Sequence, residues 1–87
     1  MIKPDFPEVY TIKGVKKYLK DMNKWRKNKG FKLYRAIAQD DDNEVIVHFE
    51  MPEESSGSWS SGCSNSDYLT TMPPFKDGWE NSLVIAE

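Results

Sequence analysis

The chain has 87 residues, of which 38% are hydrophobic and eleven are aromatic, with one cysteine and a net charge of −2 at pH 7. This length suits one domain that buries roughly 60–65% of its unfolded surface, and the aromatic content argues against a wholly disordered chain. One cysteine excludes an internal disulfide framework, and no run of about 18 apolar residues is present to span a membrane. The first ten residues lack the apolar stretch of a signal peptide, so we expect a cytoplasmic protein.

Basic and acidic residues are separated along the chain. Residues 1–35 carry eleven basic and three acidic side chains, and residues 36–87 carry one basic and eleven acidic ones. The halves therefore have net charges of +8 and −10. This asymmetry suggests a charged partner or self-association; the alternative is that the two halves fold together and neutralise each other.

The spacing of apolar residues predicts an amphipathic helix from Ile12 to Lys29. Thr11 is placed to cap its start, and Gly30 is a natural left-handed stop. Residues three or four positions apart define two faces of this helix. The apolar face contains Val15, Tyr18, Leu19, Met22 and Trp25. The basic face contains Lys13, Lys17, Lys20, Lys24 and Lys27. Upstream the pattern is ambiguous, because residues 5–8 resemble a capping box, whereas residues 9–12 also suit a short strand.

A hairpin is predicted next, from FKLYRAIAQ through the turn DDDN to EVIVHFEMP. In its first strand, from residue 31, Phe31, Leu33 and Ile37 share a face with Arg35. In its second strand Val45, Val47, Phe49 and Met51 alternate toward one face, opposite Ile46, His48 and Glu50.

The remainder is predicted as loop and strand. Residues 53–66 show no period and form a Ser/Gly-rich loop, and residues 67–72 suit one or two helical turns before Pro73 and Pro74. The tail WENSLVIAE predicts a final strand. The fold class is therefore α+β, a single domain over residues 1–87 with a small antiparallel sheet and one long helix on one face. The element order is α-β-β-loop-β, or a ferredoxin-like β-α-β-β-(α)-β if residues 9–12 form a strand.

Three short motifs contain residue types that can carry chemistry, but none of them predicts a catalytic or metal site. The spacing GSWSSGCS matches a phosphate-binding loop, but Cys63 replaces the required lysine. Cys63 and His48 are the sole cysteine and histidine, too few for a structural zinc site and without a nucleophile motif. The run DDDN lacks the spacing of a calcium loop. We expect no cofactor.

The basic helix and the Ser/Gly-rich loop are the predicted binding elements. The lysine face can steer the domain toward an acidic protein surface or toward a second copy of the chain. In the loop, a tryptophan among small polar residues resembles an antibody-like recognition loop, with the alternative that Trp59 docks inward on the sheet. The candidate binding residues are Lys13, Lys17, Lys20, Lys24, Arg26, Lys27, Trp59, Ser60, Ser61 and Cys63.

One long stretch resembles the middle of the dimeric α+β barrel proteins related to antibiotic-biosynthesis monooxygenases. It covers residues 17–54, KYLKDMNKWRKNKGFKLYRAIAQDDDNEVIVHFEMPEE. The resemblance lies in a helix ending near a tryptophan, a glycine, a Tyr-Arg strand, an acidic turn and a Val-x-Val strand. It implies a ferredoxin-like fold that dimerises through its sheets, with a small apolar ligand pocket between helix and sheet. No catalytic residue is carried across, because the second helix of that family is replaced here by the Ser/Gly-rich stretch.

These observations predict a small non-catalytic binding or regulatory module, of adaptor or inhibitor type. One alternative is a small-molecule-binding or cofactor-independent oxygenase-like dimer with an aromatic pocket near Tyr18, Trp25, Phe49 and Trp59. A second alternative is single-strand nucleic-acid binding through the helix lysines, which the acidic half of the chain disfavours.

Overall fold

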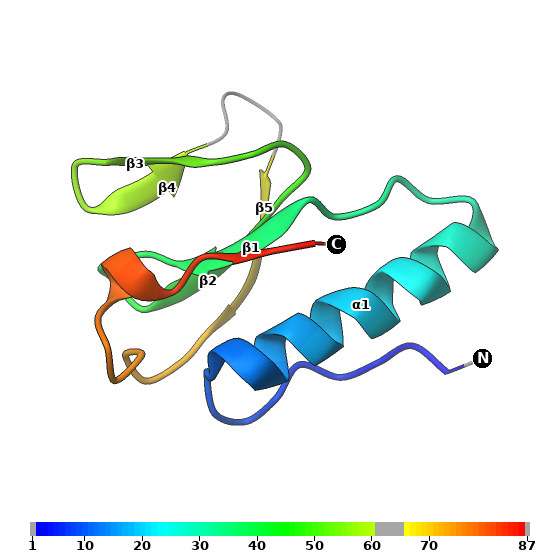
Figure 1. Ribbon diagram of the computed structural model, residues 1–87, viewed down its shortest axis with the longest axis horizontal. Coiled ribbons are helices and arrows are strands. Elements are labelled where there is room, and N and C mark those ends of the chain that lie inside the picture. The colour runs from blue at the N-terminus through cyan, green and yellow to red at the C-terminus, as the bar shows by residue number, and fades with distance from the viewer. Residues whose placement is uncertain (1, 61–65, 87) are drawn as a thin grey trace.

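The protein forms one helix packed against a small antiparallel sheet (Figure 1). The computed structural model describes residues 2–60 and 66–86. The elements are α1 (Ile12–Lys29), β1 (Ala36–Gln39), β2 (Glu44–His48), β3 (Glu53–Ser55), β4 (Ser58–Ser60), β5 (Ser66–Thr71), the 3₁₀ turn η1 (Trp79–Asn81) and β6 (Val84–Ile85). Four strands pair in the order β5-β2-β1-β6, and β3 and β4 pair as a separate hairpin. The predicted α+β class is confirmed.

Helix α1 begins and ends where the sequence predicts. Thr11 has extended backbone angles, and its hydroxyl oxygen accepts a hydrogen bond from the Gly14 N–H at 3.0 Å. Gly30 is left-handed, with φ of 78°, and its N–H donates to the carbonyls that end the helix. Because Ile12 is already helical and Thr11 is the cap, residues 9–12 form no strand. The β-α-β-β-(α)-β order, which needs that strand, is not the one observed in residues 2–60.

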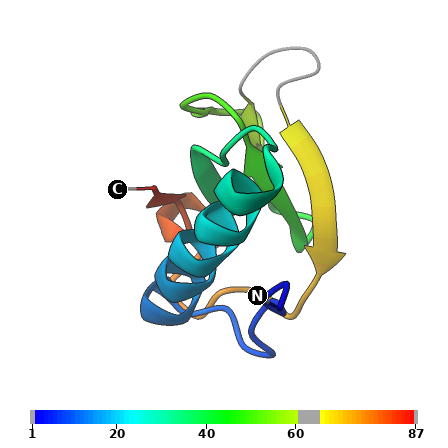
Figure 2. The same ribbon diagram turned by 90° about the vertical axis from the view of Figure 1, so that its right-hand side faces the viewer.

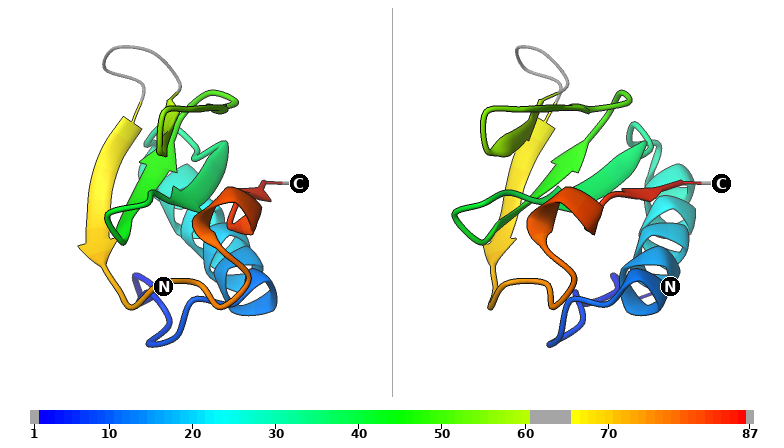
Figure 3. Two further views of the ribbon diagram at one scale, coloured as in Figure 1. Left: turned by 90° about the vertical axis from the view of Figure 1, so that its left-hand side faces the viewer. Right: turned by 60° about the vertical axis from the view of Figure 1, so that its left-hand side comes forward.

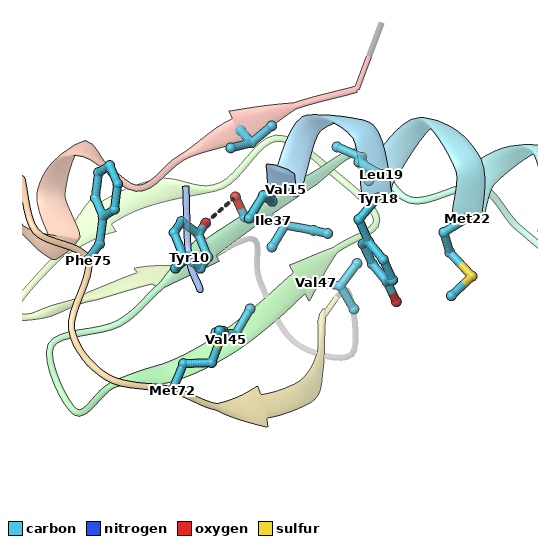
Figure 4. Close-up of a cluster of buried hydrophobic side chains, with 11 residues drawn as sticks. Tyr10, Val15, Tyr18, Leu19, Met22, Ile37, Val45, Val47, Met72 and Phe75 are labelled. Carbon is cyan, nitrogen blue, oxygen red and sulfur yellow. Dashed lines mark hydrogen bonds between the residues drawn. The ribbon is translucent and has the colours of Figure 1, made fainter. Parts of the chain in front are cut away.

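The core lies between α1 and the sheet (Figure 4). The predicted apolar face of the helix is confirmed: Val15, Tyr18, Leu19 and Met22 are buried, and Trp25 packs half-buried beside them. The sheet and its flanking loops contribute Ile37, Val45, Val47, Met72, Phe75 and Val84, and Tyr10 completes the cluster from the segment before the helix. This burial is the main source of folding free energy in a domain of this size.

The first strand of the predicted hairpin is shorter than expected. It begins at Ala36, so Phe31 and Leu33 lie outside the sheet and are about half exposed. The reason is local: the Asn23 side chain accepts from the Tyr34 N–H at 2.7 Å and donates to the Tyr34 carbonyl at 2.9 Å. The Asn23 side-chain amide thus forms the hydrogen bonds with the Tyr34 N–H and carbonyl that a neighbouring strand would otherwise form.

Strand burial departs from simple alternation. Val45 and Val47 are buried as predicted, but His48, expected on the opposite face, is buried too. All four residues of β1 are buried, because α1 contacts β1, and β4 and η1 contact it as well. Strand β2 ends at His48, so Phe49 is only half-buried and Met51 is exposed.

The Ser/Gly-rich segment contains a hairpin that the sequence prediction missed. Strands β3 and β4 pair in register from Glu53 opposite Ser60 to Ser55 opposite Ser58. Ser56 and Gly57 both have positive φ, 42° and 88°, as a two-residue hairpin turn requires. The prediction of a loop is therefore wrong for residues 53–60.

Two further segments join the sheet. Residues 67–72 were expected to be helical, but Ser66–Thr71 form β5, where tyrosine and the two threonines suit a strand and pair with β2. The predicted final strand is confirmed as β6, shortened to two residues by the preceding turn η1. Figure 2 shows α1 crossing the sheet between the β5 edge and the C-terminal segment. Within the described residues, no helix is both long and apolar enough to cross a membrane.

Candidate functional site

The predicted lysine face of α1 is exposed along its whole length. Lys13, Lys17, Lys20, Lys24 and Lys27 all lie on the side of the helix away from the buried face. The single acid of the helix, Asp21, accepts a hydrogen bond from Lys17 Nζ at 2.8 Å. This hydrogen bond, with the charges of Lys17, Lys20 and Lys24, lowers the pKa of Asp21. With five lysines and this one carboxylate, the face carries a net positive charge.

A groove of about 470 Å³ lies beside the lysine face, between α1 and the end of β6. Lys13, Lys16, Lys17 and Lys20 line the helix side of the groove. Leu19 and Asn23 contribute from the same helix, and Ile85 and Ala86 form the opposite wall. The side chain of Leu19 is almost fully buried, whereas 41% of Ile85 is exposed. The groove therefore combines a cationic rim with apolar walls.

Arg26, which was predicted to act with the lysines, points elsewhere. Its Nε donates to the Lys32 carbonyl at 2.6 Å, and Nη1 donates to the Tyr34 hydroxyl at 3.3 Å. Its guanidinium carbon lies 4.4 Å from the centre of the Tyr34 ring and 5.4 and 5.6 Å from those of Phe31 and Phe49. Stacking of this kind fixes the side chain. Arg26 therefore holds residues 31–34 against the end of the helix and does not lie among the lysines.

Trp59 is docked inward, which is the alternative that the sequence left open. Its backbone N–H donates to Asp40 Oδ1 at 2.9 Å, and its indole Nε1 donates to the Trp79 carbonyl at 3.2 Å. The two indole rings meet edge to face, with centroids 6.5 Å apart. Half-buried and hydrogen-bonded, Trp59 ties the β3–β4 hairpin to η1 and to the turn after β1, which leaves it poorly placed as an outward anchor.

The remaining loop residues contribute little to a described site. Ser60 is exposed at the end of β4, whereas Ser61 and Cys63 fall outside the described residues. His48 is fully buried in the sheet, and burial lowers the pKa of its imidazole. In residues 2–60 and 66–86, no three His, Cys, Asp or Glu side chains are grouped to hold a metal ion.

The aromatic residues named for an oxygenase-like pocket are distributed over separate ring pairs. Tyr18 packs on Phe6, Trp25 on Phe31, Phe49 on Tyr34, and Trp59 on Trp79. None of these four residues lines the groove beside α1. The groove beside α1 is therefore a different site from the aromatic pocket of the oxygenase-like alternative, which stays a prediction.

Sequence reasoning found three of the four groove lysines but missed Lys16, Asn23 and the β6 wall. Lys16 and Asn23 border the basic face on the helical spacing, so a wider definition of that face includes them. The part played by Ile85 and Ala86 depends on which strand lies beside the helix, and the sequence predicts a final strand without giving its neighbours.

In comparisons with known proteins, no protein-family model, no curated protein and no solved structure matches this chain. The resemblance to the dimeric α+β barrel proteins therefore stays a prediction, and the functional argument depends on the geometry of the chain itself.

Proposed function

We propose that this protein is a small non-catalytic binding module that uses the lysine face of α1 to dock on an acidic surface of another protein. The observation that carries the proposal is the groove beside α1, where four lysines surround apolar walls. A cationic patch beside an apolar recess suits a protein surface, because charge speeds and orients the encounter while apolar contact slows dissociation.

The rest of the fold supports this role by holding the helix rigid. The buried face of α1 is anchored in the core, and both helix ends are capped. The lysine side chains thus extend from a fixed backbone, which lowers the entropy lost on binding. A module of this kind acts by occupying its partner's surface, as an adaptor or an inhibitor does.

The test compares two charge-matched triple variants. The face variant changes Lys17, Lys20 and Lys24 to Gln, and the control variant changes Lys3, Lys29 and Lys32 to Gln. Each removes three positive charges, but the control lysines lie near Trp25 and Phe49, away from the groove. Circular dichroism and urea unfolding first establish that both variants fold as the wild type does.

Tagged wild type and both variants are then incubated with lysate of the organism that encodes the protein, and bound proteins are quantified by mass spectrometry. We expect acidic proteins retained by the wild type and the control to be lost with the face variant. With the purified partner, the association rate should fall roughly tenfold or more and lose most of its salt dependence. Equal capture by all three proteins would contradict the proposal.

Single-strand nucleic acid is tested in the same experiment with a fluorescein-labelled oligothymidylate. Tight binding that falls steeply with salt and is lost in the face variant would replace the protein partner with a nucleic acid. We expect weak binding, since the walls of the groove are aliphatic and offer no exposed ring on which a base can stack.

A further inference from the structure

Strand β6 is an edge of the four-stranded sheet, and it borders the groove. Among the residues that the structure describes, it pairs only with β1, with Ala36 opposite Ile85 and Ile37 opposite Val84. The Ala86 N–H donates to the Arg35 carbonyl at 2.8 Å, on the β1 side. Because backbone groups alternate in direction along an antiparallel strand, the N–H and carbonyl of Ile85 point away from β1. An edge with such outward groups is a template for another strand.

The side chains around this edge define what can bind there. Ile85 is 41% exposed although it is a large apolar residue on an edge strand, and Leu19 lies at the adjoining helix wall. Lys13, Lys16 and Lys20 line the helix side of the groove, and a lysine side chain combines an apolar stem with a charged end. A ligand that fits must therefore offer carboxylates to the rim and apolar groups to the walls.

We propose that the groove between α1 and β6 binds an extended segment of the partner in which acidic and apolar residues alternate, and that this segment adds a strand to the β6 edge. An extended chain projects successive side chains to opposite sides, so alternation gives it one acidic and one apolar face. Main-chain hydrogen bonds to Ile85 supply affinity, and the lysines select for acidic sequence. This inference rests on the proposed function and names the partner's binding segment.

The probe is a capped hexapeptide, Glu-Val-Glu-Val-Glu-Val, compared with capped hexaglutamate. Each is titrated into the ¹⁵N-labelled full chain and followed by amide chemical shifts. We expect the alternating peptide to bind more tightly and to shift the amides of Ile85, Ala86 and residues 13–20. In the wild type we also expect intermolecular nuclear Overhauser effects between the peptide backbone and Ile85. This measurement does not depend on any variant folding correctly.

Two substitutions of Ile85 distinguish the contribution of its backbone N–H to peptide binding from the contribution of its side chain. Ile85→Pro removes the outward N–H, and proline is tolerated on edge strands. Ile85→Ala removes most of the side chain but keeps the N–H. Proline should weaken binding of the alternating peptide about tenfold more than alanine does.

The outcomes distinguish this inference from the proposed function. If both peptides bind equally, shift only the lysine amides and are insensitive to Ile85→Pro, strand addition is overturned while charge-based docking on the lysine face stands. If neither peptide binds but the captured partner still depends on Lys17, Lys20 and Lys24, the groove inference alone is overturned. If partner capture is also independent of those lysines, both proposals fail.

Discussion

The Gln39 side chain is the centre of a buried polar network that joins three distant segments. Its Nε2 donates to the carbonyls of Asn43, Met72 and Pro73 at 3.1–3.3 Å, and its Oε1 accepts from the Phe75 N–H at 2.7 Å. The Gln39 N–H donates to the Ser82 hydroxyl oxygen at 2.8 Å, and the single Ser82 hydroxyl proton is shared between the carbonyls of Trp79, at 2.6 Å, and Gln39, at 3.1 Å. One fully buried side chain thus fixes the chain between β5 and η1.

Replacing Gln39 with leucine should destabilise the protein strongly. Leucine has a similar volume but leaves the Phe75 N–H and the carbonyls of Met72 and Pro73 without this partner, whereas the Asn43 carbonyl keeps its hydrogen bond from the Met72 N–H. Each buried unsatisfied group costs roughly 1–3 kcal/mol. We expect the free energy of unfolding, measured by urea titration with tryptophan fluorescence, to fall by about 2 kcal/mol or more.

The matched control for Gln39→Leu is Asn28→Leu, because Asn28 is an exposed amide near the end of α1. Its change in unfolding free energy should stay within about 0.5 kcal/mol. A loss of less than 0.5 kcal/mol for Gln39→Leu would show that water or rearranged backbone replaces the network.

Residues whose role follows from local spacing are predictable, and residues whose partners are distant are not. The helix face and the Thr11 cap depend on neighbours within four positions, so the sequence predicts them correctly. Asn23 and Arg26 also lie on the helix, but their partners at residues 31–34 meet them only after the chain reverses at Gly30. Charge and helical spacing alone therefore placed Arg26 on the binding face, where it does not lie.

Among the elements, the β3–β4 hairpin lies outside the four-stranded sheet, and a few specific contacts hold it in place. The Asp40 carboxylate accepts from the Trp59 N–H, and the Asp41 N–H donates to the Gly57 carbonyl at 3.0 Å. Burial raises the pKa of Asp40, and the hydrogen bond from Trp59 partly offsets this rise. All three residues of β3 are exposed, so apolar burial contributes little to holding that strand.

Removing the Asp40 carboxylate should therefore loosen the hairpin while the sheet stays intact. We expect Asp40→Ala to speed amide hydrogen exchange of Trp59 and its β4 neighbours about tenfold, since roughly 1–2 kcal/mol of local stability is lost. Amides in β1 and β2 should keep the protection they have in the wild type.

Asp40→Asn is the matched control, because it retains an oxygen acceptor at the same position. Its exchange rates in β4 should remain close to those of the wild type. Equal acceleration by alanine and asparagine would mean that the charge of Asp40 stabilises the hairpin; no acceleration by either would mean that Trp59 packing on Trp79 is sufficient.

Elements were predictable where a regular pattern is long, and unpredictable where it is short. Eighteen residues of α1 contain five turns of consistent spacing, so its bounds could be read from the sequence. The three-residue strands β3 and β4 contain too few positions to show alternation, and only the dipeptide Ser56-Gly57 marks their turn. Residues 66–71 form a strand because β2 offers them an edge to pair with, which local propensity does not encode.

At the scale of the whole molecule, the separation of charge along the sequence becomes a separation in space. Seven of the ten lysines lie on α1, while exposed acids such as Glu53 and Glu54 lie on β3, which Figure 3 shows away from the helix. The ion pair of Lys17 with Asp21 is internal to the helix and does not join the two halves of the chain. The α+β class could be predicted from the order of elements. The groove could not, because it exists only where the sheet places β6 beside α1.

The stability of the whole fold should decrease between neutral and mildly acidic pH through the single histidine. His48 is fully buried on β2, between Ala36 of β1 and Ser66 of β5, and burial lowers its pKa from the ordinary value of 6.5. Below pH 6.5 the imidazole therefore binds a proton in the unfolded chain more readily than in the folded protein. The contribution of His48 to the unfolding free energy is fully present above pH 6.5. It is lost as the pH falls toward the pKa of the folded state, with a slope of at most about 1.4 kcal/mol per pH unit for one proton.

Urea titrations at pH 7.5, 6.5 and 5.5 measure this loss directly. His48→Gln, which has no titrating group at the site, should show a smaller decrease over the same interval even if it is less stable throughout. Asp40 and Glu44 act in the opposite sense, since their raised pKa values make protonation favour the folded state as the pH falls. Both carboxyl groups are present in the wild type and in His48→Gln, so their effect cancels when the two proteins are compared. Parallel curves for the wild type and His48→Gln would show that the imidazole gains a compensating contact on protonation, and that the mild-acid sensitivity of the fold originates elsewhere.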